Sequence, residues 1–180
     1  MSQLAHFQLL ARYNAWMNDK VYAAAAQLSP EALALDRGAF FPSILATLNH
    51  IAAGDIVWLT RFAEHPGCTA LRQALATAPK PKALGQQLFD TLAPLQALRG
   101  ELDGHISDWV AALSEPDLAY GLAYANMQGV PAQRAYASLM LHFFNHQTHH
   151  RGQVSTLLFQ AGQDVGVTDL LALIADVDPR

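Results

Sequence analysis

Four long stretches of this sequence carry apolar side chains at alternating steps of three and four residues, a spacing that gathers them on one face of an α-helix. The stretches cover residues 4–28, 43–63, 84–113 and 134–161. In the third, the spacing continues on both sides of Pro94, which favours one kinked helix over two. Because no repeat and almost no strand accompany these helices, the sequence predicts an all-α four-helix bundle.

The connections between these helices are unequal. Residues 29–41 form a connection that contains Asp36, Arg37 and Gly38, and residues 66–82, rich in small residues and prolines, predict a mainly irregular crossover. Within 115–133, apolar residues alternate with small ones and a turn-like Asn126–Gly129 follows, so a short hairpin is predicted before the last helix. Since two of the three connections are long, the helices need not run simply up-down-up-down.

Length and composition favour a single domain spanning residues 1–180, and no composition shift marks a second. Just over half of the residues are hydrophobic (52%), and the chain has no leader-like start and no run of 18 apolar residues. We therefore expect a soluble, non-exported, cytoplasmic protein without a membrane partner. The net charge of −4 argues against a nucleic-acid partner, which would require clustered Lys and Arg.

The last predicted helix contains a histidine cluster, His142, His146, His149 and His150. On a helical wheel of 100° per residue, His150 and His146 face the apolar stripe, whereas His142 and His149 lie on the flank. The inward pair is spaced i, i+4, so both rings can reach one metal ion. The alternative is a pair of core histidines that are satisfied by hydrogen bonds.

Two familiar metal motifs are excluded. A zinc-protease helix requires H-E-x-x-H, but Gln147 follows His146. A di-iron bundle requires Glu-x-x-His, and no Glu lies three residues before any His. The inward pair therefore needs a third ligand from elsewhere in the chain.

The third ligand is predicted to be His50, in the middle of the second helix. The residues stacked around it are small, including Ala46 and Gly54, and such a face either packs closely against another helix or leaves a cavity. His6, His65 and His105 are in contrast predicted to be solvated, and the lone Cys68 to be an incidental edge thiol.

Three neutral imidazoles would leave a divalent ion its full charge and an open position, the arrangement of catalytic sites. A water or thiol bound there would be easier to deprotonate, and imidazole suits zinc, nickel, copper and iron alike. Asn14 and Gln153 are candidates for the pocket or for supporting hydrogen bonds. Asp55 lies about 140° round the helix from His50, too far to bond that ring directly. The position of Arg151 is ambiguous, and a solvated or inter-subunit face is the one considered for it.

The sequence also resembles the DinB family of the DinB/YfiT-like metalloenzyme superfamily over nearly its whole length. The resemblance rests on Asn145-His146-x-x-His149-His150-Arg151-Gly152-Gln153, on Tyr13-Asn14-Ala15-Trp16 and on Leu48-Asn49-His50 with Asp55 and Trp58. The resemblance implies metal ligation by His50, His146 and His150, with zinc or nickel as the ion. It also implies an up-down-down-up bundle that is commonly a homodimer.

Three functions follow as hypotheses. The leading one is a metalloenzyme that transfers a low-molecular-weight thiol to a small electrophilic substrate, because superfamily relatives include thiol-dependent S-transferases and a maleylpyruvate isomerase. The second is a metal-dependent hydrolase, distinguished by activity without added thiol. The third is a non-catalytic, metal-binding stress-response protein, for which a fourth protein ligand would be expected.

Overall fold

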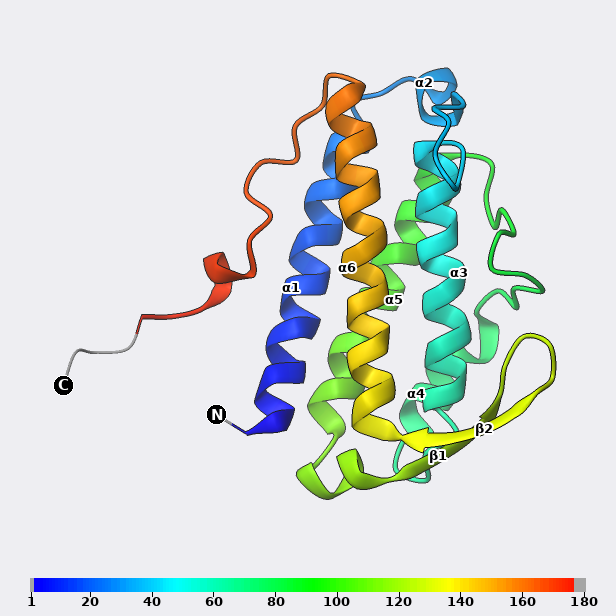
Figure 1. The fold of residues 1–180 in the computed structure, drawn as a ribbon, viewed down its shortest axis with the longest axis vertical. Helices are drawn as coiled ribbons and strands as arrows, with labels where there is room; N and C mark the ends of the chain where they lie inside the picture. The colour runs from blue at the N-terminus through cyan, green and yellow to red at the C-terminus, as the bar shows by residue number, and fades with distance from the viewer. Residues whose placement is uncertain (1, 177–180) are drawn as a thin grey trace.

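Four long helices lie side by side in the computed structural model, which describes residues 2–176 (Figure 1). They are α1 (Gln3–Ala25), α3 (Ile44–Phe62), α5 (Leu92–Ala112) and α6 (Tyr136–Gln160). Both α1 and α3 pack against α5 and α6, so α1 and α3 occupy opposite corners of the arrangement. The protein is thus mostly helical, as predicted. None of the described helices combines the length and the apolarity that crossing a bilayer requires.

The remaining elements are short, and all of them except η3, which follows α6, lie in the connections between the long helices. They are α2 (Pro30–Ala34), α4 (Thr69–Ala74), η1 (Leu75–Thr77), η2 (Glu115–Ala119), β1 (Gly121–Ala125), β2 (Pro131–Ala135) and η3 (Leu170–Leu173). The strands β1 and β2 pair antiparallel, so the predicted hairpin is present and the fold is not purely helical. The 29–41 connection contains α2, and α4 and η1 occupy part of the 66–82 crossover, which was predicted to be mainly irregular.

The core between the long helices is apolar and contains several aromatic rings. The largest fully buried side chains are those of Tyr136, Phe62, Phe143, Ile44, Leu48, Leu59, Leu95, Leu102, Ile106, Leu122, Met140 and Leu158. Phe62 stacks on Trp109 with ring centroids 4.6 Å apart, and the Trp109 indole donates a 2.8 Å hydrogen bond to the Tyr136 hydroxyl. This packing fixes α3, α5 and α6 relative to one another below the histidines.

The third long helix is shorter than predicted, and Pro94 does not lie in its interior. It begins at Leu92, so Pro94 lies in the first turn, where its missing N–H has no helical partner to lose. Residues 84–91 instead form a loop that is tied to α3. The Asn49 side-chain oxygen accepts hydrogen bonds from the backbone N–H groups of Leu88 and Phe89, at 2.8 and 3.0 Å. These bonds across the fold compete with the helical spacing and hold the loop over α3.

Two residues near the end of α3 were wrongly predicted to be exposed. His65 is buried and accepts a 3.0 Å hydrogen bond from the Gly67 N–H, while its other nitrogen lies 3.6 Å from Asp117. Cys68 is also buried, with its sulfur 3.5 Å from the Tyr136 hydroxyl. Pro66 and Gly67 end the helix, but Asp117 of η2 and Tyr136 of α6 contact the two buried side chains and cover that end.

Candidate metal centre

Three imidazoles from two helices converge beside the 84–91 loop. His50 projects from α3, and His146 and His150 project from successive turns of α6. One nitrogen of each ring lies within 4.8 Å of one nitrogen of the other two. The Nε2 atoms of His50 and His150 are 3.0 Å apart. The structure therefore brings together all three residues that the sequence singled out as candidate ligands.

The hydrogen bonds behind two of these rings decide where their protons are. The Nδ1 of His50 lies 2.8 Å from the backbone oxygen of Leu84, which can only accept, so this nitrogen carries the proton. The Nδ1 of His150 lies 2.8 Å from the side-chain oxygen of Gln153 and is protonated for the same reason. Both Nε2 atoms consequently direct lone pairs at each other, and two lone pairs cannot satisfy one another. A cation between them can.

The donor set fits a divalent transition-metal ion. Imidazole nitrogens bind such ions at about 2.1 Å, and tetrahedral ligands are then roughly 3.4 Å apart, within the range that these rings span. Metal-bound histidines usually donate their second ring N–H to a carbonyl or carboxylate, as His50 and His150 do here to carbonyl oxygens. No fourth histidine, cysteine or carboxylate from the described part of the chain joins the group.

Gly54 creates the space for His146. A Cβ atom added at Gly54 would lie 3.0 Å from the His146 ring, and only a glycine avoids this contact. The small face of the second helix, for which close packing and a cavity were both considered, thus accommodates an imidazole from α6. Phe41 covers the opposite side, since its ring stacks on His50 with centroids 3.8 Å apart and meets His150 edge-on.

Burial keeps all three rings neutral near pH 7, which metal binding requires. It lowers the pKa of His146 to about 3, with a further contribution from the neighbouring imidazoles. Burial also lowers the pKa of His50, although the Leu84 carbonyl partly opposes this. The pKa of His150 is lowered for the same reason, against an opposing effect of Gln153.

The remaining sequence candidates occupy different positions. Gln153 holds His150 as described, and its amide nitrogen is 3.4 Å from the exposed His149. His142 is exposed and meets the Trp58 ring edge-on, at the mouth of the site. Asn14 makes no hydrogen bond to any of the three histidines. Its amide donates to Asp103 at 2.9 Å and its oxygen accepts from Arg151.

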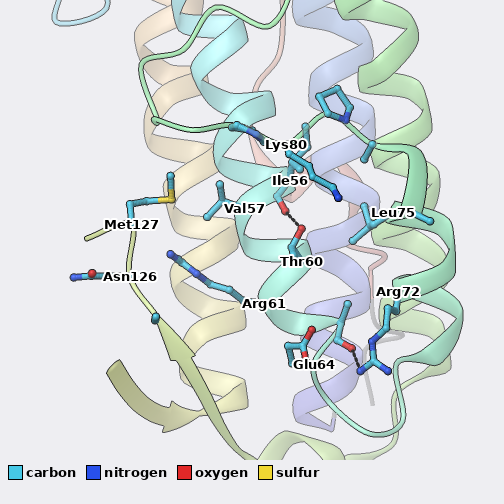
Figure 2. A pocket seen from close by; sticks show the side chains of 16 residues that line it. Ile56, Val57, Thr60, Arg61, Glu64, Arg72, Leu75, Lys80, Asn126 and Met127 are labelled. Atoms are coloured by element: carbon cyan, nitrogen blue, oxygen red, sulfur yellow. Dashed lines mark hydrogen bonds between the residues drawn. The ribbon is translucent and has the colours of Figure 1, made fainter. Parts of the chain in front are cut away.

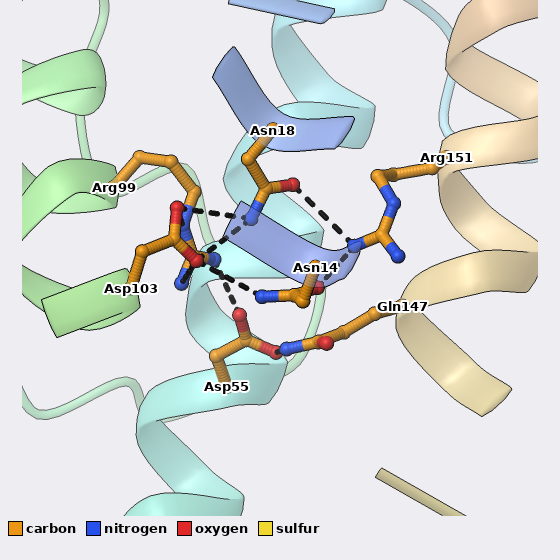
Figure 3. Close-up of polar contacts among 7 residues, drawn as sticks. All are labelled: Asn14, Asn18, Asp55, Arg99, Asp103, Gln147 and Arg151. Atoms are coloured by element: carbon orange, nitrogen blue, oxygen red, sulfur yellow. Dashed lines mark hydrogen bonds and ion pairs between the residues drawn. The ribbon is translucent and has the colours of Figure 1, made fainter. Parts of the chain in front are cut away.

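A second buried polar cluster joins side chains from all four long helices (Figure 3). We call it the polar network, and its members are Asn14 and Asn18 of α1, Asp55 of α3, Arg99 and Asp103 of α5, and Gln147 and Arg151 of α6. Its central ion pair joins Arg99 to Asp55, and Asp103 lies 3.0 Å from the same guanidinium. The Gln147 amide donates to Asp55 at 2.7 Å. Arg99 thus contacts both carboxylates, Arg151 donates to the Asn14 and Asn18 side-chain oxygens, and all four long helices contribute.

Sequence reasoning missed most of this network. Asp55 was expected not to bond His50, and it does not, but the expectation that Arg151 would lie on a solvated or inter-subunit face was wrong. Arg151 is buried between α1 and α6, where burial lowers its pKa to about 10 against the opposing effect of Asp55. One feature of the sequence does indicate the network. Gln147 and Arg151 are four residues apart, as are His146 and His150, so they share a second face of the same helix.

The mostly helical fold and the three converging imidazoles define a class of helical proteins with a candidate metal site. The sequence matches the model of the DinB family over residues 1–177, and the chain therefore belongs to that family. It is also similar to Protein DinB of Bacillus subtilis (strain 168), with 24% identity over 173 residues, which cover 89% of this chain and 88% of that protein.

Proposed function

We propose that this protein is a metalloenzyme in which His50, His146 and His150 bind a divalent ion, zinc or nickel, within an up-down-down-up four-helix bundle. The observation that carries the proposal is the pair of buried Nε2 lone pairs of His50 and His150, 3.0 Å apart and without another partner. When bound, the ion would act as a Lewis acid that lowers the pKa of a coordinated water or thiol.

The reaction that we favour is transfer of a low-molecular-weight thiol to a small electrophilic substrate. The sulfur would form a bond to an electrophilic carbon, the leaving group would depart with its bonding electrons, and the thiol proton would pass to solvent. Two features support an open, reactive site: a fourth protein ligand is absent among the described residues, and a cavity of about 330 Å³ reaches His146.

Metal analysis of the purified protein tests the site. We expect about one ion per chain, lost in His50→Ala and retained in His149→Ala, which removes an exposed imidazole of the same helix. Stoichiometric metal in His50→Ala would contradict the proposal that His50 is a ligand. A screen of small thiols against 1-chloro-2,4-dinitrobenzene, with and without metal, then tests the reaction.

The same screen separates the alternatives. Turnover of an ester without added thiol would favour a metal-dependent hydrolase. Bound metal without turnover in either assay would favour a non-catalytic metal-binding stress-response protein.

We also propose a cytoplasmic homodimer, because a free thiol substrate requires a reducing compartment and because the apolar side chains of Leu141 and Phe159 are exposed on α6. Sedimentation of the metal-loaded protein would measure the oligomeric state.

A further inference from the structure

A cleft leads away from the candidate metal centre along the outer face of α3. Two adjoining cavities form it, and both are lined by Val57, Arg61, Asn126 and Met127. The first cavity, of about 330 Å³, contains Gly54 and His146. The second, of about 480 Å³, extends under the 79–81 segment to Lys80 (Figure 2). Together they have the size of a pocket for a small organic molecule.

Arg61 lines both cavities, and two aromatic rings hold its side chain in place. Its guanidinium lies over the Trp58 ring at 4.6 Å and over the Tyr124 ring at 5.1 Å. These contacts use the flat faces of the guanidinium and leave its N–H edges available. In the part of the chain that the structure describes, Arg61 has neither an ion pair nor a side-chain hydrogen bond, whereas the buried Arg99 and Arg151 have several partners.

The charge around Arg61 is positive. Arg72 and Lys80 line the same cavity as Arg61, and Glu64 is the one acidic residue among the lining side chains. Arg72 donates a 2.6 Å hydrogen bond to the Ala63 carbonyl. Burial lowers the pKa of Arg61, so this half-buried cation would be stabilised by an anion brought into the cleft.

The other lining residues are mainly apolar, and they include Ile56, Leu75, Ala76, Ala78, Pro79 and Met127. We propose that this cleft binds an organic oxyacid, whose apolar body lies along α3 and whose carboxylate or phosphate group pairs with the N–H edge of Arg61. Arg61 is then a specificity-determining residue. The proposal rests on the proposed function in one respect only, that the other end of the molecule faces the metal centre.

The length of the molecule follows from the helix. Gly54, beside His146, and Arg61 are seven residues apart on α3, which corresponds to about 10 Å along the axis. A chain of about six to eight carbon atoms has this reach. Probes of this length therefore test binding of the anionic group at Arg61 and require no reaction at the metal centre.

The experiment uses the metal-free full-length protein labelled with ¹⁵N. Hexanoate, hexyl phosphate and the neutral hexanamide are titrated while the Nε–H signal of Arg61 is followed by NMR. We expect at least one of the two anions to bind about tenfold or more tightly than hexanamide and to shift the Arg61 signal. The anion that binds more tightly identifies the oxyacid group.

Two variants accompany the titration. Arg61→Gln should abolish the preference for the anion while hexanamide binding persists, which also shows that the cleft is still formed. Arg12→Gln removes an exposed arginine of α1, at the opposite corner from α3, and should leave the preference unchanged. Arg61→Lys should give an intermediate preference, because it keeps the charge but loses the planar fork.

Equal binding of the anions and hexanamide to the unaltered protein would overturn the proposal and leave Arg61 as a clamp between α3 and the hairpin. So would an anion preference that survives in Arg61→Gln. Both outcomes are independent of metal content, so they are distinguishable from failure of the metal site, which is measured separately by metal analysis of the His50→Ala variant.

Discussion

The histidine triad and the polar network share α3 and α6, yet the two clusters accommodate buried polar groups in opposite ways. On α6, His146 and His150 belong to the triad, and the residues that follow each of them, Gln147 and Arg151, belong to the network. The network balances opposite charges within the protein, although Gln147 Oε1 and Arg151 Nε have no hydrogen-bond partner among the described residues. The triad gathers three neutral groups of one kind whose lone pairs converge, and it becomes complete only with a cation. A cluster built for stability and a cluster built for a ligand can therefore be told apart by their internal charge balance.

The largest expected effect comes from breaking the network. Asp55→Asn leaves the Arg99 guanidinium without its closest carboxylate, and loss of one partner of a buried ion pair typically costs about 3–5 kcal/mol. We expect the free energy of unfolding, measured with urea, to fall by that amount. The matched control Asp19→Asn changes an exposed carboxylate of α1 and should have little effect. An unchanged midpoint in Asp55→Asn would show that the network does not stabilise the fold.

The second prediction concerns the ion. At a free metal concentration of about 100 times the dissociation constant, Zn²⁺ or Ni²⁺ should add about 2.7 kcal/mol to the free energy of unfolding. His50→Ala should lose this gain and retain most of the metal-free stability, because it leaves the network intact. Thermal unfolding with and without metal measures the difference. Equal stabilisation of His50→Ala would show that the ion binds elsewhere.

A smaller effect is expected from the hydrogen bond behind His150. Gln153→Leu frees the His150 Nδ1 proton from its partner, and such changes weaken metal binding by about 10–100-fold. Competition with a chromophoric chelator gives the affinity. Gln160→Leu, the same exchange at an exposed position of the same helix, is the control. If both variants bind metal equally well, Gln153 does not orient the ligand.

The smallest effect is a pH dependence of the metal-free protein. The pKa of His146 is about 3 in the folded state, below its unfolded value of about 6.5, so the unfolded chain takes up the proton first as the pH falls. Stability should therefore be constant above about pH 6.5 and fall progressively below it. His146→Gln should flatten this slope in urea unfolding series from pH 7.5 to 5. If the pH dependence of the free energy of unfolding is the same in His146→Gln, groups other than His146 cause it.

The triad was predictable from sequence because its geometry is largely local. The i, i+4 spacing of His146 and His150 sets their common direction, and the small residues around His50 mark a face that another helix can approach. The polar network was not predictable in the same way. Burial of Arg99 or Arg151 depends on partners that three other helices supply, and a single helical pattern gives no indication of them. The start of α5 was missed for a similar reason, since Asn49 holds residues that otherwise have helical spacing in a loop.

The adjacency of the two clusters on α6 also limits how the chain can vary in length. One residue inserted between Phe143 and His146 would turn the following part of the helix by about 100°, carrying both histidines away from His50 and both network residues away from Asp55. A single insertion would thus abolish metal binding and core stability together. The spacing from Phe143 to Gln153 must consequently stay constant, because both clusters and the Gln153 contact with His150 depend on it.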